Sequence, residues 1–215
     1  MERSIEISVG EYYHIYNRGV EKRDIFLDDR DMERFVKLLY LANGEKHFYF
    51  RAVQGLPLAD IDTGKKKVAI IAYTLMPNHF HILVKEIVEG GISDFMEKLL
   101  TAYAMYFNKR YDRVGPLFQG TYKAEHVDRD EYLKYLFAYI HLNPIKLIEP
   151  QWKERGVRDK KKAEQYLKTY RFSSYLDYIG VDREEKLILA REEAPDYFSD
   201  RYEFEDFVRD WLAYR

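Results

Sequence analysis

The stretch from Val68 to Lys85, VAIIAYTLMPNHFHILVK, constrains the fold of this chain more than any other. Its first half is an almost unbroken apolar run with several β-branched residues, which predicts a strand buried on both faces. Pro77 and Asn78 then favour a turn, so the chain is expected to reverse and return as a second strand from about His79 to Lys85. Two neighbouring strands of one sheet are therefore predicted.

Side chains alternate along the second of these strands. His79 and His81 share one face, while Phe80 and Ile82 share the other. Two imidazoles two residues apart on a rigid strand can converge on a divalent metal ion. The same pair could instead be structural and hydrogen-bonded at the start of the strand. A second stretch, LKYLFAYIHLNPIKL from Leu133 to Leu147, favours the metal.

That second stretch is predicted to be a helix with two distinct sides. At about 100° per residue, Leu133, Leu136 and Ile140 fall on the side that faces the core. Tyr139 and Asn143, four residues apart, fall together on a flank beside it. Pro144 is expected to end or kink the helix and to disfavour the helical conformation at Asn143, which would free the Asn143 amide to point at a ligand.

The order of predicted elements indicates the fold class. The expected elements are a strand within residues 11–19, a helix opened by Asp28 and Asp29, a strand over 47–53, the two central strands, a helix capped by Ser93, an edge strand or hairpin in GPLFQGTYKAEHV, and a helix capped by Asp128 or Asp130. Strand, helix, strand, strand, helix, strand is the order of a ferredoxin-like split βαβ sandwich. We therefore predict an α+β fold: an antiparallel sheet with helices on one face, plus a small helical C-terminal extension.

Composition excludes several classes of protein and of site. The chain has no cysteine, so disulfides and thiolate metal sites are excluded, and a metal must be held by His, carboxylate or amide groups. Such ligands favour Mg²⁺ or Mn²⁺, although two imidazoles would also accept Zn²⁺. No apolar run approaches the roughly 18 residues of a membrane span, and the first residues lack a signal-peptide core. A cytosolic protein is the expectation.

Charge is distributed unevenly along the chain. The net charge is −2, but residues 182–215 hold 11 acidic against 6 basic residues, which leaves +3 for residues 1–181. Residues 65–171, which contain both marked stretches, hold 20 basic against 13 acidic residues. The chain also has 20 tyrosines and 13 phenylalanines. Aromatic rings among Lys and Arg suit single-stranded nucleic acid, although most of these tyrosines are also explained as core and rim residues.

Several spaced motifs resemble one known family. MPNHFHILV resembles the His-hydrophobic-His motif of the HUH single-strand endonucleases, and Tyr139 in YIHLNPIK resembles the catalytic tyrosine of the REP-associated tyrosine transposases and related insertion-sequence enzymes. The resemblance extends to YHIYNRG, GPLFQGTYKA and YRFSSYLDYIG, and covers most of residues 12–180. It implies a metal-dependent endonuclease and strand transferase that forms a covalent 5′-phosphotyrosine on hairpin-bearing single-stranded DNA.

The resemblance also implies roles for individual residues. Tyr139 would be the nucleophile, with Tyr135 one turn earlier as its rival, and His79, His81 and Asn143 would hold Mg²⁺ or Mn²⁺. Arg18 and Lys123 are candidates for contact with DNA phosphates, or else for surface salt bridges. REP-like palindromes or transposon ends would be the partner, and both monomers and homodimers occur among relatives.

Residues 1–150 would then be the catalytic domain. Residues 151–215 would be a basic linker and a C-terminal helical extension, whose few apolar residues require it to pack on the core. Two alternatives stay open: a non-catalytic protein that binds DNA hairpins on the same scaffold, and an RNA-binding module.

Overall fold

Four strands form one antiparallel sheet in the order β2-β3-β1-β4. The structure is a computed structural model that describes residues 6–213. The strands are β1 (Tyr12–Arg18), β2 (Val68–Met76), β3 (His79–Glu86) and β4 (Lys123–His126). The helices are α1 (Asp29–Ala42), α2 (Phe50–Val53), α3 (Gly91–Arg110), α4 (Asp130–Leu142), α5 (Trp152–Arg155), α6 (Lys160–Leu167), α7 (Tyr175–Tyr178) and α8 (Arg201–Ala213). Short 3₁₀ helices span Val20–Lys22, Leu58–Asp60, Asn143–Leu147, Glu184–Ile188 and Arg191–Glu193.

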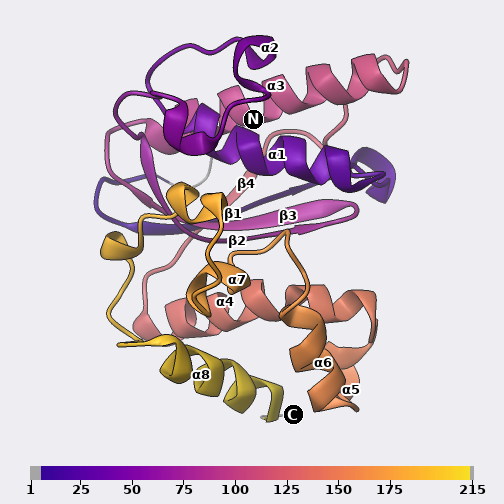
Figure 1. Cartoon of the computed structure of the whole chain (residues 1–215), viewed down its shortest axis with the longest axis vertical. Helices are drawn as coiled ribbons and strands as arrows, with labels where there is room; N and C mark the ends of the chain where they lie inside the picture. Colours follow the sequence, from indigo (N-terminus) through magenta and orange to yellow (C-terminus); the bar gives the residue numbers. More distant parts are fainter. Residues whose placement is uncertain (1–5, 214–215) are drawn as a thin grey trace.

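The predicted α+β antiparallel sheet and the pairing of β2 with β3 are confirmed, but the helices do not all lie on one face. Figure 1 shows α1 and α3 on one side of the sheet and α4 and α8 on the other. Phe80 of β3 packs against Phe35 of α1 at a ring-centroid distance of 5.0 Å, whereas His81 faces Tyr139 of α4. The reason lies in β2, which is buried along its whole length and so needs cover on both faces.

The C-terminal part of the chain covers the outer edge of β2. Ser173 bridges Thr74 in antiparallel fashion, and Leu189 bridges Ile70 in parallel fashion. Beyond these bridges, α8 packs against α4. The C-terminal residues therefore close a sheet edge that would otherwise be open to pairing with another chain. Across residues 6–213, no helix combines the length and the apolar character that a membrane crossing requires.

The predicted strand over residues 47–53 is wrong. The sheet is complete without this segment, and its last four residues form the short helix α2 (Phe50–Val53). Tyr49, which the alternating pattern placed in a strand, is 85% exposed. Alternating aromatic residues form a strand only where a neighbouring strand can pair with them, and this segment has no such neighbour in the sheet.

Helix starts were predicted correctly only for α1. There the Asp28 carboxylate accepts a hydrogen bond from the Asp31 amide at 3.1 Å, as expected of a cap. The predicted caps of α4, Asp128 or Asp130, are wrong, because Arg129 precedes the helix and its side chain makes no capping bond.

The cap of α3 comes from outside the helix. This helix starts at Gly91, two residues before the predicted cap Ser93. The buried Glu86 carboxylate, at the end of β3, accepts hydrogen bonds from the amides of Gly91 at 3.1 Å and Ile92 at 2.8 Å. A strand residue thus accepts the hydrogen bonds that a capping residue just before the helix would ordinarily accept.

Candidate active site

A cavity of about 540 Å³ opens where β1, β3 and β4 approach α4. The predicted residues His79, His81, Tyr139, Arg18 and Lys123 all line it. Its full lining is Tyr16, Asn17, Arg18, Lys22, Asn78, His79, His81, Gln119, Lys123, Tyr139 and Lys146. The structure therefore brings together, from distant parts of the sequence, most of the residues that were expected to form one site.

Strand register places the two histidines on the face that α4 covers. His79 is opposite Arg18 of β1, and His81 is opposite Tyr16, so these side chains share one face of the sheet. Nδ1 of His79 is hydrogen-bonded to the Asn78 side-chain oxygen at 2.6 Å. Nε2 of His81 faces Tyr139 of α4.

Tyr139 approaches these histidines from the helix. Its hydroxyl lies 3.5 Å from Nε2 of His81, and the two rings meet edge-on with centroids 5.2 Å apart. The ammonium group of Lys153 lies 4.0 Å from the centroid of the Tyr139 ring. Tyr135, the rival candidate, stacks on Tyr139 at 6.0 Å and is 41% exposed. Of the two phenols, that of Tyr139 is the one beside an imidazole.

Asn143 does not line the cavity and lies buried beside His79. Only 1% of its surface is exposed, and its side chain raises the pKa of His79 against the larger lowering effect of burial. The expectation that Pro144 frees Asn143 from the helical conformation is wrong, because Asn143 has φ −53° and ψ −39°. Pro144 instead stands in the first turn of the 3₁₀ helix that continues α4 (Asn143–Leu147), where its missing N–H is not needed.

The donor set fits a hard divalent ion. Among residues 6–213, no group of three or more His, Asp or Glu is arranged to hold a metal, so a third protein ligand beside the two imidazoles would come from another residue type, such as the amide oxygen of Asn143. Nδ2 of Asn143 is buried and makes no hydrogen bond. Because Nδ2 is an N–H donor, it calls for a hydrogen-bond acceptor such as a phosphate oxygen, and a cation would have to be bound by the Asn143 amide oxygen.

Both histidines are held in the neutral form. Burial, reinforced by the nearby cation of Lys146, lowers the pKa of His79 to about 4. Burial, with the neighbouring His14, lowers the pKa of His81 well below its usual range. Neutral imidazole is the form that binds a metal, so the site needs no deprotonation at neutral pH.

The protein is expected to lose stability in mildly acidic solution, because three buried histidines resist protonation in the folded state. Burial lowers the pKa of His14 and His79 to about 4 and that of His141 to about 3, from an ordinary value of 6.5. Between these values the unfolded chain binds protons that the folded chain excludes. The free energy of unfolding should therefore fall as pH drops from 6.5 towards 4, by up to about 1.4 kcal/mol per pH unit for each such histidine. Urea unfolding at pH 7.5, 5.5 and 4.5 measures this, and equal values at all three would contradict it.

The two predicted DNA contacts lie at the mouth of the cavity. Nε of Arg18 donates to the Gln119 side-chain oxygen at 2.5 Å, and Nζ of Lys123 lies 5.9 Å from the centroid of the Tyr16 ring. Neither makes an ion pair among the described residues. The salt-bridge alternative is therefore not what the structure has, and both cations face a site that could hold a phosphate.

Sequence reasoning missed two residues behind the histidines, His14 and Glu125. Nε2 of His14 lies 2.8 Å from Nδ1 of His81, and His14 Nδ1 lies 3.8 Å from a Glu125 carboxylate oxygen. A third histidine in the alternating strand YYHIYNR was the available signal. It could not be used, because only the pairing of β1 with β3 and β4 brings these side chains together.

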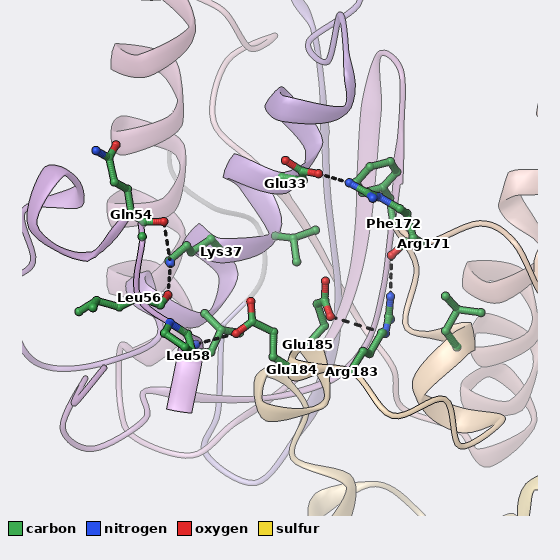
Figure 2. Close-up of a pocket in the computed structure, with 14 residues that line it drawn as sticks. Glu33, Lys37, Gln54, Leu56, Leu58, Arg171, Phe172, Arg183, Glu184 and Glu185 are labelled. Carbon is green, nitrogen blue, oxygen red and sulfur yellow. Dashed lines mark hydrogen bonds and ion pairs between the residues drawn. The ribbon is translucent and has the colours of Figure 1, made fainter. Parts of the chain in front are cut away.

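A larger cavity, of about 640 Å³, lies elsewhere and is a weaker candidate. It lies between α1, the loop at residues 54–58 and the segment 171–185. Figure 2 shows its charged side chains bonded to one another: Arg171 pairs with Glu33, and Lys37 donates to two backbone carbonyls. Because these groups already pair with each other, we interpret the cavity as a gap where packed segments meet.

The chain is similar to a known family over part of its length and to a solved structure. Residues 61–143 match the family model described as "Transposase IS200 like". No curated protein matches the chain. One similar solved structure is titled "Structure of the REP associates tyrosine transposase bound to a REP hairpin". It has 11% sequence identity and a TM-score of 0.48, and the match covers 86% of this chain and 90% of that one.

Proposed function

We propose that this protein cuts and rejoins single-stranded DNA through Tyr139, using a divalent metal; the match of residues 61–143 to the IS200-like transposase model supports this proposal. The observation that carries the proposal is the 3.5 Å approach of the Tyr139 hydroxyl to Nε2 of His81 within one cavity. His79, His81 and Asn143 would hold the Mg²⁺ or Mn²⁺ ion.

The reaction is a transesterification. The Tyr139 oxygen attacks a DNA phosphorus and the bond from phosphorus to the 3′ oxygen breaks. The products are a 5′-phosphotyrosine and a 3′-hydroxyl, which takes up a proton while the phenol loses one. The ion, when bound, would draw electrons from the phosphate and stabilise the charge that develops on it. Because the phosphotyrosine keeps the energy of the broken ester, a 3′-hydroxyl can later attack it and rejoin the strand without a nucleotide cofactor.

Positive charge around the cavity supports a phosphate as the reacting group. Arg18, Lys22, Lys123 and Lys146 line it, and Lys153 lies against the Tyr139 ring. The net negative charge of the whole chain comes instead from the acidic residues of the C-terminal segment. A cationic wall beside a nucleophile favours entry of a polyanion and positions its phosphate.

Aromatic rings on α4 support a single strand as the substrate. Tyr132, Tyr135 and Tyr139 form a stacked row with centroids 6.2 Å and 6.0 Å apart, and Trp211 of α8 meets Tyr135 edge-on. Rings next to a basic cavity offer surfaces on which unpaired bases can stack. We therefore propose single-stranded DNA with an adjacent hairpin as the partner, in keeping with the motifs.

The test uses labelled single-stranded oligonucleotides that carry an imperfect hairpin and a randomised flank. With Mg²⁺ or Mn²⁺ the protein should form an adduct that survives denaturing electrophoresis, and EDTA should prevent it. His81→Ala should lose the adduct by a factor on the order of 10³ or more, as expected when a metal-assisted step is removed. His126→Ala is the matched control, since His126 lies on β4 outside the cavity and pairs with Glu11.

The outcome against the proposal is equally definite. Hairpin binding that ignores EDTA, with no adduct under either metal, would identify a non-catalytic hairpin-binding protein. A preference for the RNA version of the same oligonucleotide would point to an RNA-binding module instead.

A further inference from the structure

His14 touches His81 on the side away from the cavity. It lies on β1, is 5% exposed, and its Nε2 is 2.8 Å from Nδ1 of His81, with the two rings stacked at 23°. A hydrogen bond between two imidazole nitrogens needs one proton, so one ring must donate and the other accept. The choice decides whether Nε2 of His81 carries a proton or a lone pair.

Glu125 breaks this symmetry. Its carboxylate oxygen lies 3.8 Å from Nδ1 of His14, a nitrogen that is buried and makes no hydrogen bond. Negative charge beside Nδ1 favours a proton there over a lone pair, as in the carboxylate–histidine pairs behind metal ligands. With the His14 proton on Nδ1, its Nε2 must accept, and Nδ1 of His81 must donate.

The carboxylate is itself fixed in place and kept ionised. The Tyr16 hydroxyl donates to Glu125 at 2.5 Å and the Tyr132 hydroxyl donates at 3.1 Å. Hydrogen bonds from two hydroxyls favour the charged form of a carboxyl group. Since Tyr16 lies on β1 and Tyr132 on α4, Glu125 joins the sheet to the helix that carries Tyr139.

We propose that His14, with Glu125 behind it, is a positioning residue that holds His81 in the tautomer whose Nε2 lone pair points towards the Tyr139 hydroxyl. An isolated neutral imidazole prefers its proton on Nε2, so the network reverses the preference of His81. With the proton on Nδ1, Nε2 is ready to bind a cation. The link to metal rests on the proposed function, whereas the tautomer itself does not.

The first measurement needs neither metal nor DNA. In ¹⁵N-histidine-labelled protein at pH 7.5, the ring nitrogen shifts of His81 should show a protonated Nδ1 and an unprotonated Nε2. His14→Phe keeps an aromatic ring at this position but removes the acceptor, and should move the His81 proton to Nε2. Glu125→Gln, which removes only the charge, should produce the same change or a mixture of tautomers. A wild-type His81 protonated on Nε2, or shifts unchanged in both variants, would overturn the proposal.

The second measurement links the tautomer to metal binding. Mn²⁺ titration followed by electron paramagnetic resonance should show affinity weakened about 10–100-fold by His14→Phe and Glu125→Gln, the usual effect of losing a partner behind a metal ligand. His126→Phe, on the same sheet but outside the cavity, should bind like the wild type. If the wild type binds no Mn²⁺ while the tautomer behaves as expected, the proposed function fails and the positioning role stands. Equal Mn²⁺ affinity in wild type and both variants would show that His14 and Glu125 do not affect metal binding, and would overturn that part of the proposal.

Discussion

Replacing Tyr139 with phenylalanine is expected to abolish the covalent DNA adduct, while Tyr135→Phe leaves it intact. The two tyrosines are one helical turn apart and stack on each other, yet only the Tyr139 hydroxyl lies beside Nε2 of His81. Removing a covalent nucleophile lowers rates by factors on the order of 10⁶, which puts the residual adduct below detection.

Denaturing electrophoresis with a labelled oligonucleotide and Mn²⁺ measures this result directly. Tyr135→Phe is a matched control, because it removes one hydroxyl from the same row of rings. Persistence of the adduct in Tyr139→Phe would mean that another hydroxyl attacks, with Tyr135 the first to examine. Loss of the adduct in both variants, with DNA binding also lost, would show that the row of rings serves binding more than chemistry.

Arg183→Ala is expected to cause the largest loss of stability. Arg183 forms an ion pair with Asp177 and donates to the backbone carbonyls of Arg171 and Ser173, both at 2.6 Å. The Asp177 side chain is only 1% exposed. Without its partner this carboxylate is left buried and uncompensated, which costs about 3–5 kcal/mol.

Arg171, which lines the same cavity as Arg183, provides a control with the opposite expectation. Arg171 pairs with Glu33, and both side chains are about half exposed, so Arg171→Ala should cost no more than about 1 kcal/mol. Figure 2 shows Arg171 and Arg183 in the same pocket, and urea unfolding measures both variants. Similar losses in the two would contradict the distinction between a buried and a solvated pair. The double variant Arg183→Met with Asp177→Leu should recover part of the stability.

Local patterns predicted those parts of the fold that local sequence controls. The apolar run of β2, the turn at Pro77 and Asn78, and the alternation in β3 all depend on neighbours in the chain, and they are confirmed. The start of α3 could not be predicted this way. Its capping carboxylate, Glu86, belongs to the preceding strand, so a closer candidate, Ser93, was chosen in its place.

The residues of the site likewise fall into those that local sequence predicts and those that it does not. His79 and His81 follow from period two on one strand, and Tyr139 and Asn143 from the helical turn that separates them. The role of His14 could not be predicted, because it depends on which strand pairs with β3. That pairing is decided by the whole sheet and not by any short motif.

The imidazole of His81 and the phenol of Tyr139 come from the same polypeptide, 58 positions apart. Strand breakage by this arrangement would therefore not require two copies of the protein to meet. Each molecule could act alone and in proportion to its own number, even when very few are present in a cell.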